Sequence, residues 1–283
     1  MAAVKWKPFP YDAAGYAYQG AALKKAWPEL HRGDREPFPD AAFVKQAFAR
    51  HPRLKGSLDA DKAAAALQSA WRAYHRGDFA AAVAEGTALG PIGANAANKA
   101  ANIYATYLET DGGRKREILL KSAERAEELQ AAAPDFVNAF YFHAQALGRY
   151  SQEISIVKAL AQGIGGKVKA SLDKALKLEP DHADAHIALG AYHAEIVSKV
   201  GGMLASLTYG ASKEEAMKHF ALARKLLPDS AIARIEQANG LAMLFGKSKL
   251  AEAEKLYEEA ARVKPADAME KLDVEQARGE AEG

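Results

Sequence analysis

The sequence contains no cysteine, carries almost no net charge and has no long apolar run. Without cysteine there can be no disulfide framework, no thiolate metal site and no lipid anchor on a cysteine. A formal charge of +2 over 283 residues gives no general attraction for nucleic acid, and no local basic patch replaces it. No segment approaches the roughly 20 apolar residues of a membrane helix. We therefore expect no membrane span and no nucleic-acid partner.

The N-terminus also lacks an apolar signal-peptide core, because MAAVKWKPFPYDAAG is interrupted by charged residues, proline and glycine. The cytoplasm is therefore the expected location, or the periplasm if a leader has been removed from the chain. Strand patterns are equally scarce, since aromatic and β-branched residues never alternate over a strand-length run. Apolar residues make up 49% of the chain, and much of that share is alanine, the strongest helix former. We expect an all-α protein.

Three segments that end in proline repeat the same pattern of large and small residues. Small residues stand five positions before each proline and larger residues stand eight positions before it. These are Ala175, Ala223 and Ala260, and Leu172, Phe220 and Tyr257, counted from Pro180, Pro228 and Pro265. Large residues between small ones at helical spacing let two antiparallel helices interlock closely, and proline then ends the helix.

These positions resemble the signature of the tetratricopeptide repeat (TPR), in which leucine, glycine, tyrosine, alanine and proline recur over about 34 residues. The match is strong after Pro134 and loose before it. We predict a TPR-like α-solenoid of antiparallel helix pairs, with Asp40 and Ser212 as helix N-caps. The whole chain, 1–283, is expected to form one domain. Its parts are a degenerate helical region at 1–60, divergent repeats at 61–134, the best-matched repeats at 135–265 and a capping helix or tail at 266–283.

Two repeats are longer than an ordinary one, because Pro134, Pro180 and Pro228 follow one another at 46 and 48 residues. The extra residues form apolar inserts at 149–167 and 192–213. We expect each insert to begin by continuing the first helix of its repeat, then to break at glycines. The two inserts are expected either to roof a pocket or to meet a second subunit, which makes a homo-oligomer a possible state.

Three sequence blocks, ALGRYSQ, KALKLEPDHADAHIALG and EEAMKHFALARKLLPDS, resemble the T component of TRAP transporters and the related regulator of microtubule dynamics family. The resemblance spans roughly 134–265. It implies a TPR-like helical domain with elongated repeats. In the bacterial periplasmic lipoproteins of this kind, which can form trimers, it also implies a hydrophobic cleft for a small ligand that is passed to a substrate-binding protein. This chain has no cysteine to carry the lipid, so the fold and an apolar groove are what transfer best.

Several motifs that suggest chemistry have simpler structural explanations. His182, His186 and His193 are spaced to share one helical face, as zinc ligands would be, but the last two occupy positions that face a partner helix. The segment 163–167 lacks the first glycine and the final Ser/Thr of a phosphate loop. Both Arg-Gly-Asp triplets, at Arg32 and Arg76, fall at helix turns. No nucleophile is paired with a histidine. We therefore predict no enzyme activity, no metal and no cofactor.

The concave face of a TPR stack is lined by the first helix of each repeat, which predicts a groove. Its residues are Asn138, Tyr141, Gln145, Asp184, Ile187, Ile232, Ile235 and Asn239. Tyrosine, isoleucine and amides suit an apolar or weakly polar guest, although some of these residues equally suit the core between repeats. The sequence favours a non-catalytic scaffold that holds a protein segment. Its alternative is a carrier of a small apolar ligand, like a TRAP T component. We expect Tyr141→Ala or Ile235→Asp to weaken binding without unfolding the chain.

Overall fold

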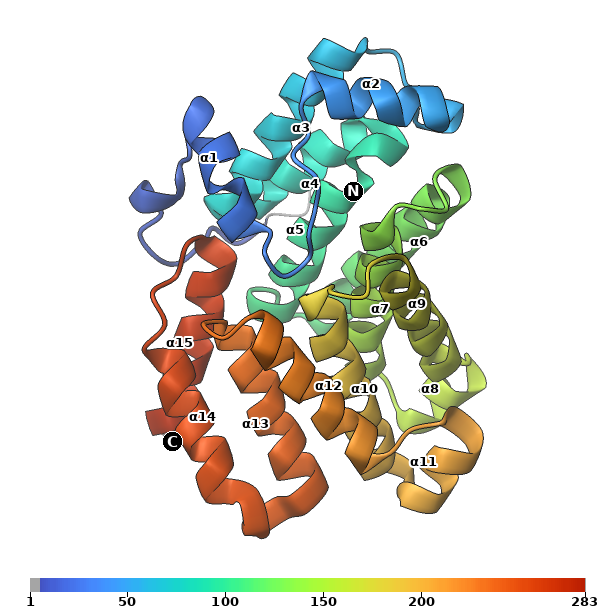
Figure 1. The fold of residues 1–283 in the computed structure, drawn as a ribbon, viewed down its shortest axis with the longest axis vertical. Coiled ribbons are helices and arrows are strands. Elements are labelled where there is room, and N and C mark those ends of the chain that lie inside the picture. Colours follow the sequence, from blue (N-terminus) through green and yellow to red (C-terminus); the bar gives the residue numbers. More distant parts are fainter. Residues whose placement is uncertain (1–5, 283) are drawn as a thin grey trace. The chain divides into compact units, whose positions relative to one another are not determined.

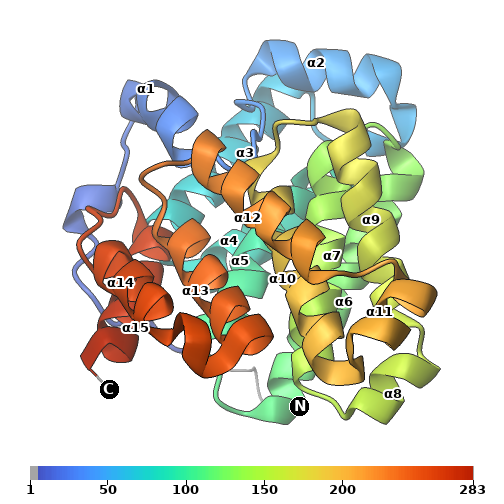
Figure 2. The same ribbon diagram turned by 60° about the horizontal axis from the view of Figure 1, so that its bottom comes forward.

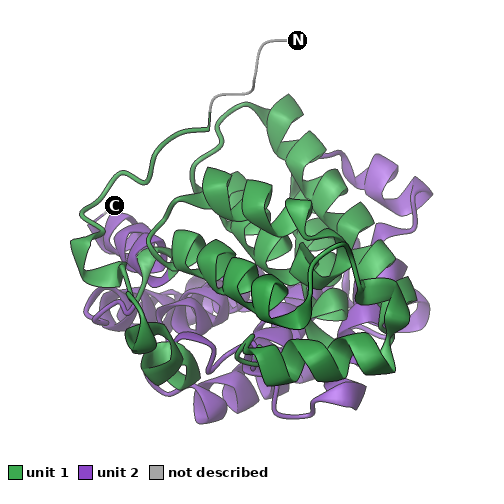
Figure 3. Cartoon of the chain, turned by 90° about the horizontal axis from the view of Figure 1, so that it is seen from above, with its two compact units in different colours: residues 1–29, 36–153, 267–269 green, residues 30–35, 154–266, 270–283 purple. Residues whose placement is uncertain are grey.

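The computed structural model describes residues 6–282, and that part of the chain forms helices and turns without a β-strand (Figure 1). The all-α prediction is confirmed. The described residues divide into two compact units, coloured separately in Figure 3. Unit 1 contains the residues up to Glu29, residues 36–153 and residues 267–269. Unit 2 contains residues 30–35, residues 154–266 and those from Glu270 onward. The assignment of the chain to a single domain stays a prediction.

Unit 1 is a succession of helices in which each helix from α2 to α6 packs on the next. Its helices are α1 (Ala21–Leu30), α2 (Ala41–Arg50), α3 (Ala60–His75), α4 (Phe79–Ala88), α5 (Ala94–Tyr107), α6 (Gly112–Ala132) and α7 (Val137–Gln152), with 3-10 turns at Ala14–Tyr16, Pro52–Leu54 and Gly90–Gly93. The predicted turn at Arg76 joins α3 to α4, where Gly77 has a positive φ of 85° and Asp78 caps α4. The predicted cap at Asp40 is also present, because its carboxylate accepts a hydrogen bond from Phe43 N.

Unit 2 contains the best-matched repeats and both inserts. Its helices are α8 (Ile156–Ala161), α9 (Ile164–Leu178), α10 (Ala183–Val200), α11 (Gly202–Tyr209), α12 (Lys213–Leu226), α13 (Ala231–Phe245), α14 (Leu250–Ala261) and most of α15 (Ala268–Glu282), with a 3-10 turn at Gly246–Lys249. Ser212 caps α12 as predicted, by accepting a hydrogen bond from Glu215 N. Helix α10 lies at the centre, in contact with α9, α12 and α13.

The proline-anchored register describes the packing in unit 2 correctly. Ala175, Ala223 and Ala260 are fully buried. Phe220 on α12 is also fully buried, and its ring lies against glycines of two neighbouring helices, Gly190 on α10 and Gly240 on α13. A Cβ atom added to Gly190 would lie 2.7 Å from Phe220 Cε1. Because Gly190 and Gly240 have no side chains, the two helices leave a slot that the Phe220 ring fills.

The two inserts form short helices that differ from each other in how they begin. The second insert starts as predicted, because α10 continues to Val200 before Gly201 turns the chain with a φ of 82°. The first does not. Helix α7 ends at Gln152, and α8 is a separate helix capped by Ser155, whose hydroxyl accepts from Lys158 N. The continuation expected there is wrong, because this serine satisfies the amide donors of a new helix start.

Candidate functional site

The predicted groove residues of unit 1 lie on α7 and make contacts within that unit. The Asn138 side chain is 3% exposed, and its Nδ2 donates to Glu36 Oε2 at 2.6 Å. Gln145 is half-buried and accepts from Asn102 Nδ2 at 2.9 Å. Tyr141 is 7% exposed. These side chains chiefly hold α7 in place.

The remaining predicted groove residues belong to unit 2, where two of them are core. Ile187 is 5% exposed and Ile235 is 1% exposed. Asp184, Ile232 and Asn239 are half-buried, and Asn239 Oδ1 accepts a hydrogen bond from the Tyr257 hydroxyl. The burial of Ile235 argues against the expectation that Ile235→Asp leaves the fold intact. A carboxylate at this position would be buried among apolar side chains with no partner. The groove itself stays a prediction, carried by the half-buried residues.

Unit 2 contains one segment that is remote in sequence from its helices, the turn at residues 30–35. The turn, called the RGD turn below, is held by His31 Nδ1, which lies 2.9 Å from Asp34 Oδ1, and both side chains are buried. The backbone of Arg35 closes the turn by donating to His31 O at 2.8 Å, with a positive φ of 51° at Arg35. The first Arg-Gly-Asp triplet therefore lies in a folded turn with its own hydrogen bonds.

The RGD turn binds to the start of α10. Gly33 O accepts a hydrogen bond from Asp184 N at 3.2 Å, which satisfies one of the amide donors left open at a helix N-terminus. A Cβ at Gly33 would lie 2.2 Å from Oδ1 of the Asp184 side chain. A larger residue at this point would therefore require the Asp184 side chain to move. Asp184, one of the predicted groove residues, thus contacts a segment of the chain itself.

Two ion pairs fix the flanks of the RGD turn within unit 2. Arg32 Nη2 lies 3.1 Å from Glu270 Oε1 on α15, and Arg35 Nη1 lies 3.6 Å from Glu179 Oε1 at the end of α9. These side chains are partly exposed, so each pair contributes at most about 1 kcal/mol. Together with the hydrogen bond at Gly33, they form a small surface that accepts a basic turn of polypeptide. No sequence pattern signals such a contact, because its two sides lie far apart in the chain.

The predicted histidine set is rearranged in the structure, and a fourth histidine joins it. His182 caps α10, with its Nδ1 accepting from Ala185 N at 3.0 Å. His186 and His193 instead stack with His219 of α12, at ring-centroid distances of 5.1 and 5.8 Å. Sequence analysis missed His219 because it lies on the partner helix. Within residues 6–282, no three His, Asp or Glu side chains are placed to hold a metal ion.

The hydrogen bonds of this cluster determine where the protons lie. His186 Nε2 is 2.9 Å from Pro180 O, which can only accept, so this nitrogen carries a proton. In neutral His186 the Nδ1 atom is then bare and accepts from His219 Nδ1 at 2.9 Å. Burial lowers the pKa of His186 and of His193. Burial, followed by repulsion from His186 and His193, lowers the pKa of His219 to about 4. All three rings are therefore neutral at pH 7.

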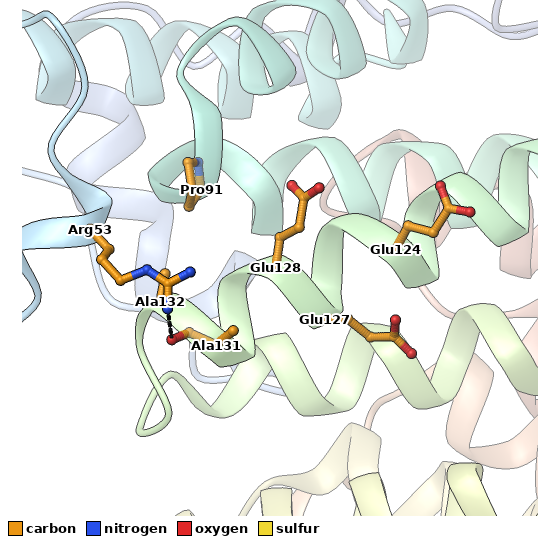
Figure 4. Close-up of a pocket in the computed structure, with 7 residues that line it drawn as sticks. All are labelled: Arg53, Pro91, Glu124, Glu127, Glu128, Ala131 and Ala132. Carbon is orange, nitrogen blue, oxygen red and sulfur yellow. Dashed lines mark hydrogen bonds between the residues drawn. The ribbon is translucent and has the colours of Figure 1, made fainter.

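A cleft of about 620 Å³ lies in unit 1, along α6. Figure 4 shows three carboxylates, Glu124, Glu127 and Glu128, on this helix, with Arg53 beyond them. Arg53 Nη1 donates to Ala131 O at 3.0 Å. Because acidic groups outnumber the single guanidinium, the cleft suits cationic groups. None of the predicted groove residues lines it.

The inserts expose most of the large apolar side chains that unit 2 leaves in solvent. Met203 is 82% exposed, Leu207 81% and Val157 72%, and Leu204, Leu160 and Ile156 are between 41% and 52% exposed. Whether the inserts roof a pocket or meet a second subunit stays a prediction. Within residues 6–282, no helix has the length and hydrophobicity to cross a bilayer.

Comparison with known proteins supports the repeat architecture. The sequence profile described as Regulator of microtubule dynamics protein 1-3 matches residues 94–281. Among the solved structures, eleven chains match. One of these is a thermophilic TPR protein of Thermus thermophilus, at 16% identity and a TM-score of 0.54, over 76% of this chain and 98% of that one. None of the curated proteins matches. At this identity the structural likeness shows the fold alone, and it confirms a TPR-like helical repeat protein.

Proposed function

The chain belongs to the Regulator of microtubule dynamics protein 1-3 family, and on that premise we propose that it is a non-catalytic scaffold whose repeats hold a segment of another protein. Repeat proteins of helix pairs expose extended faces that suit polypeptide ligands. The family description names regulators of microtubule dynamics. A scaffold that binds another protein is consistent with a regulatory role of that kind.

The observation that carries the proposal is the RGD turn of unit 2. Its six residues contribute no helix to the repeats of this unit, yet they bind at the start of α10 through Gly33 and Asp184. Arg32 and Arg35 add the two ion pairs to Glu270 and Glu179. The ends of these repeats therefore have the polar groups needed to hold a turn of polypeptide by its backbone and by its basic side chains.

The rest of the binding face is assigned to the half-buried groove residues on α13. Ile232 packs partly against Ile187 and Ala233 and keeps part of its side chain exposed. Asn239 lies two turns further along the same helix. Its hydrogen bond with Tyr257 uses Oδ1, which leaves the amide nitrogen available to a guest. An apolar side chain and an amide at this spacing suit one face of a guest helix or an extended segment.

Site-specific photo-crosslinking tests this assignment. A benzophenone amino acid is placed at Ile232, and in a matched variant at Leu222, which is half-buried on α12, the second helix of the preceding repeat. After irradiation in the cells that produce the protein, we expect protein-sized adducts at position 232 and none at position 222. Adducts of equal yield at both positions, or none at either, contradict the groove.

The same samples distinguish a protein ligand from a small one. A carrier of an apolar molecule, as the resemblance to the TRAP T component implies, gives a small mass increase at position 232 after irradiation. That result replaces the scaffold by the carrier. A protein-sized increase that an excess of the unlabelled parent chain suppresses by competition supports the scaffold.

A further inference from the structure

The two inserts of unit 2 carry two neighbouring groups of exposed apolar side chains, which together we call the insert face. It is made of the exposed side chains of α8 and α11, namely Ile156, Val157, Leu160, Met203, Leu204 and Leu207. Figures 1 and 2 show the two helices beside each other. The segment after α8 touches the end of α11, because a Cβ at Gly165 would lie 3.4 Å from Tyr209 Cε1.

The exposure of these side chains follows from how the inserts are anchored. Each insert packs on the rest of unit 2 through buried side chains, most of which are small. Ala205 and Ala211 are fully buried and Ile164 is 4% exposed. The Tyr192 hydroxyl donates to Tyr209 O at 3.4 Å, which ties α10 to the end of α11. The larger apolar side chains are therefore held outward on an ordered support, and an apolar surface of this kind marks an interaction site.

The inserts themselves carry only basic side chains, while a carboxylate residue stands at both ends of each segment. Residues 154–172 and residues 196–213 contain five lysines and no aspartate or glutamate. Three of the lysines have partners, since Lys169 pairs with Asp173, Lys199 pairs with Glu195 and Lys213 donates to Leu244 O. Lys158 and Lys167 are exposed and are left to interact with a partner.

We propose that the insert face docks on an anionic lipid bilayer, with its apolar side chains in the headgroup boundary and its lysines at the lipid phosphates. Exposed leucine, isoleucine, valine and methionine beside lysines are the composition of helices that lie in a membrane surface. Each lysine near an anionic leaflet adds about fivefold to the affinity, equivalent to about 1 kcal/mol. A second copy fits this surface less well, because a face-to-face dimer would oppose lysines of equal charge. The inference concerns a surface other than the groove and stands independently of the scaffold.

Flotation of the full chain with lipid vesicles tests the proposal. Vesicles of phosphatidylcholine alone are compared with vesicles that also contain phosphatidylglycerol, at low salt. We expect binding to the anionic vesicles, little binding to the neutral ones, and release as salt screens the lysines. Binding to neither kind of vesicle, or equal binding to both, overturns the proposal.

Matched variants locate the contact. Leu207→Asp removes an 81% exposed apolar side chain and is expected to weaken vesicle binding at least tenfold, whereas Lys158→Gln is expected to weaken it about fivefold. Leu250→Asp, at a 47% exposed position of α14, is the control and should leave binding unchanged. An unaltered circular dichroism spectrum verifies that each variant folds. Equal binding by Leu207→Asp and the parent chain overturns the proposal. So does concentration-dependent self-association that Leu204→Asp abolishes, because a second copy then covers the face.

Discussion

The glycines that flank Phe220 give a sharp prediction about how the helices of unit 2 pack. In Gly240→Ala, the new Cβ would lie 2.4 Å from Phe220 Cε2 and 2.9 Å from Cζ. The ring is fully buried and is bounded on its other edge by Gly190, so it has no room to retreat. Overpacking of this kind costs about 1–3 kcal/mol, and the helix propensity of alanine returns about 1 kcal/mol at most. We expect a net loss of about 1 kcal/mol or more.

Urea unfolding followed by circular dichroism measures this loss, with Gly148→Ala as the matched control. Gly148 lies inside α7, and a Cβ there would meet nothing within 4 Å, so the same change should stabilise the chain. Adding Phe220→Leu to Gly240→Ala should restore part of the loss, because the smaller side chain vacates the space beside Gly240. A Gly240→Ala chain as stable as the Gly148→Ala chain would refute the slot.

Two further predictions concern buried groups of unit 2. Ile235→Asp places an unpartnered carboxylate at a 1% exposed position and should destabilise the chain by about 3–5 kcal/mol, seen as a large fall in Tm, whereas an unchanged Tm would place residue 235 at the surface. His219 has a folded-state pKa of about 4 against 6.5 for the free group, so the unfolded chain binds more protons between these values. Stability is then complete above pH 6.5 and falls as pH is lowered toward 4, by a total on the order of 3 kcal/mol. The His219→Gln chain should lose part of this pH dependence in unfolding titrations. An unchanged pH dependence would show that His219 is not its origin.

The helix pairs could be predicted from the sequence because they rest on local patterns. Ala175, Ala223 and Ala260 are fully buried, as their spacing from proline predicts. The large residue Phe220 is fully buried as well. Helix starts were equally readable, since the caps at Asp40 and Ser212 depend on residues only three positions apart. Each of these signals lies within one helix or one turn.

Features that depend on distant contacts could not be predicted in this way. Ile232 and Ile235 are the same residue type on the same helix, yet one is half-buried and the other is core. Which of them faces a neighbouring helix depends on the crossing geometry, and the sequence does not contain it. The docking of Gly33 on Asp184 and the stacking of His219 on His186 and His193 also join residues far apart in the chain. The start of the first insert was predicted wrongly, because the apolar period continues from α7 into α8 although Ser155 begins a new helix.

The central claim, that the repeats hold a polypeptide, is tested most directly by native mass spectrometry of the full chain purified from the cells that produce it. We predict a complex with a second polypeptide that is retained at low collision energy, weakened by Ile232→Ala and unaffected by Leu222→Ala. A chain that carries only a small apolar molecule, or a complex that both substitutions leave equally strong, would contradict the claim.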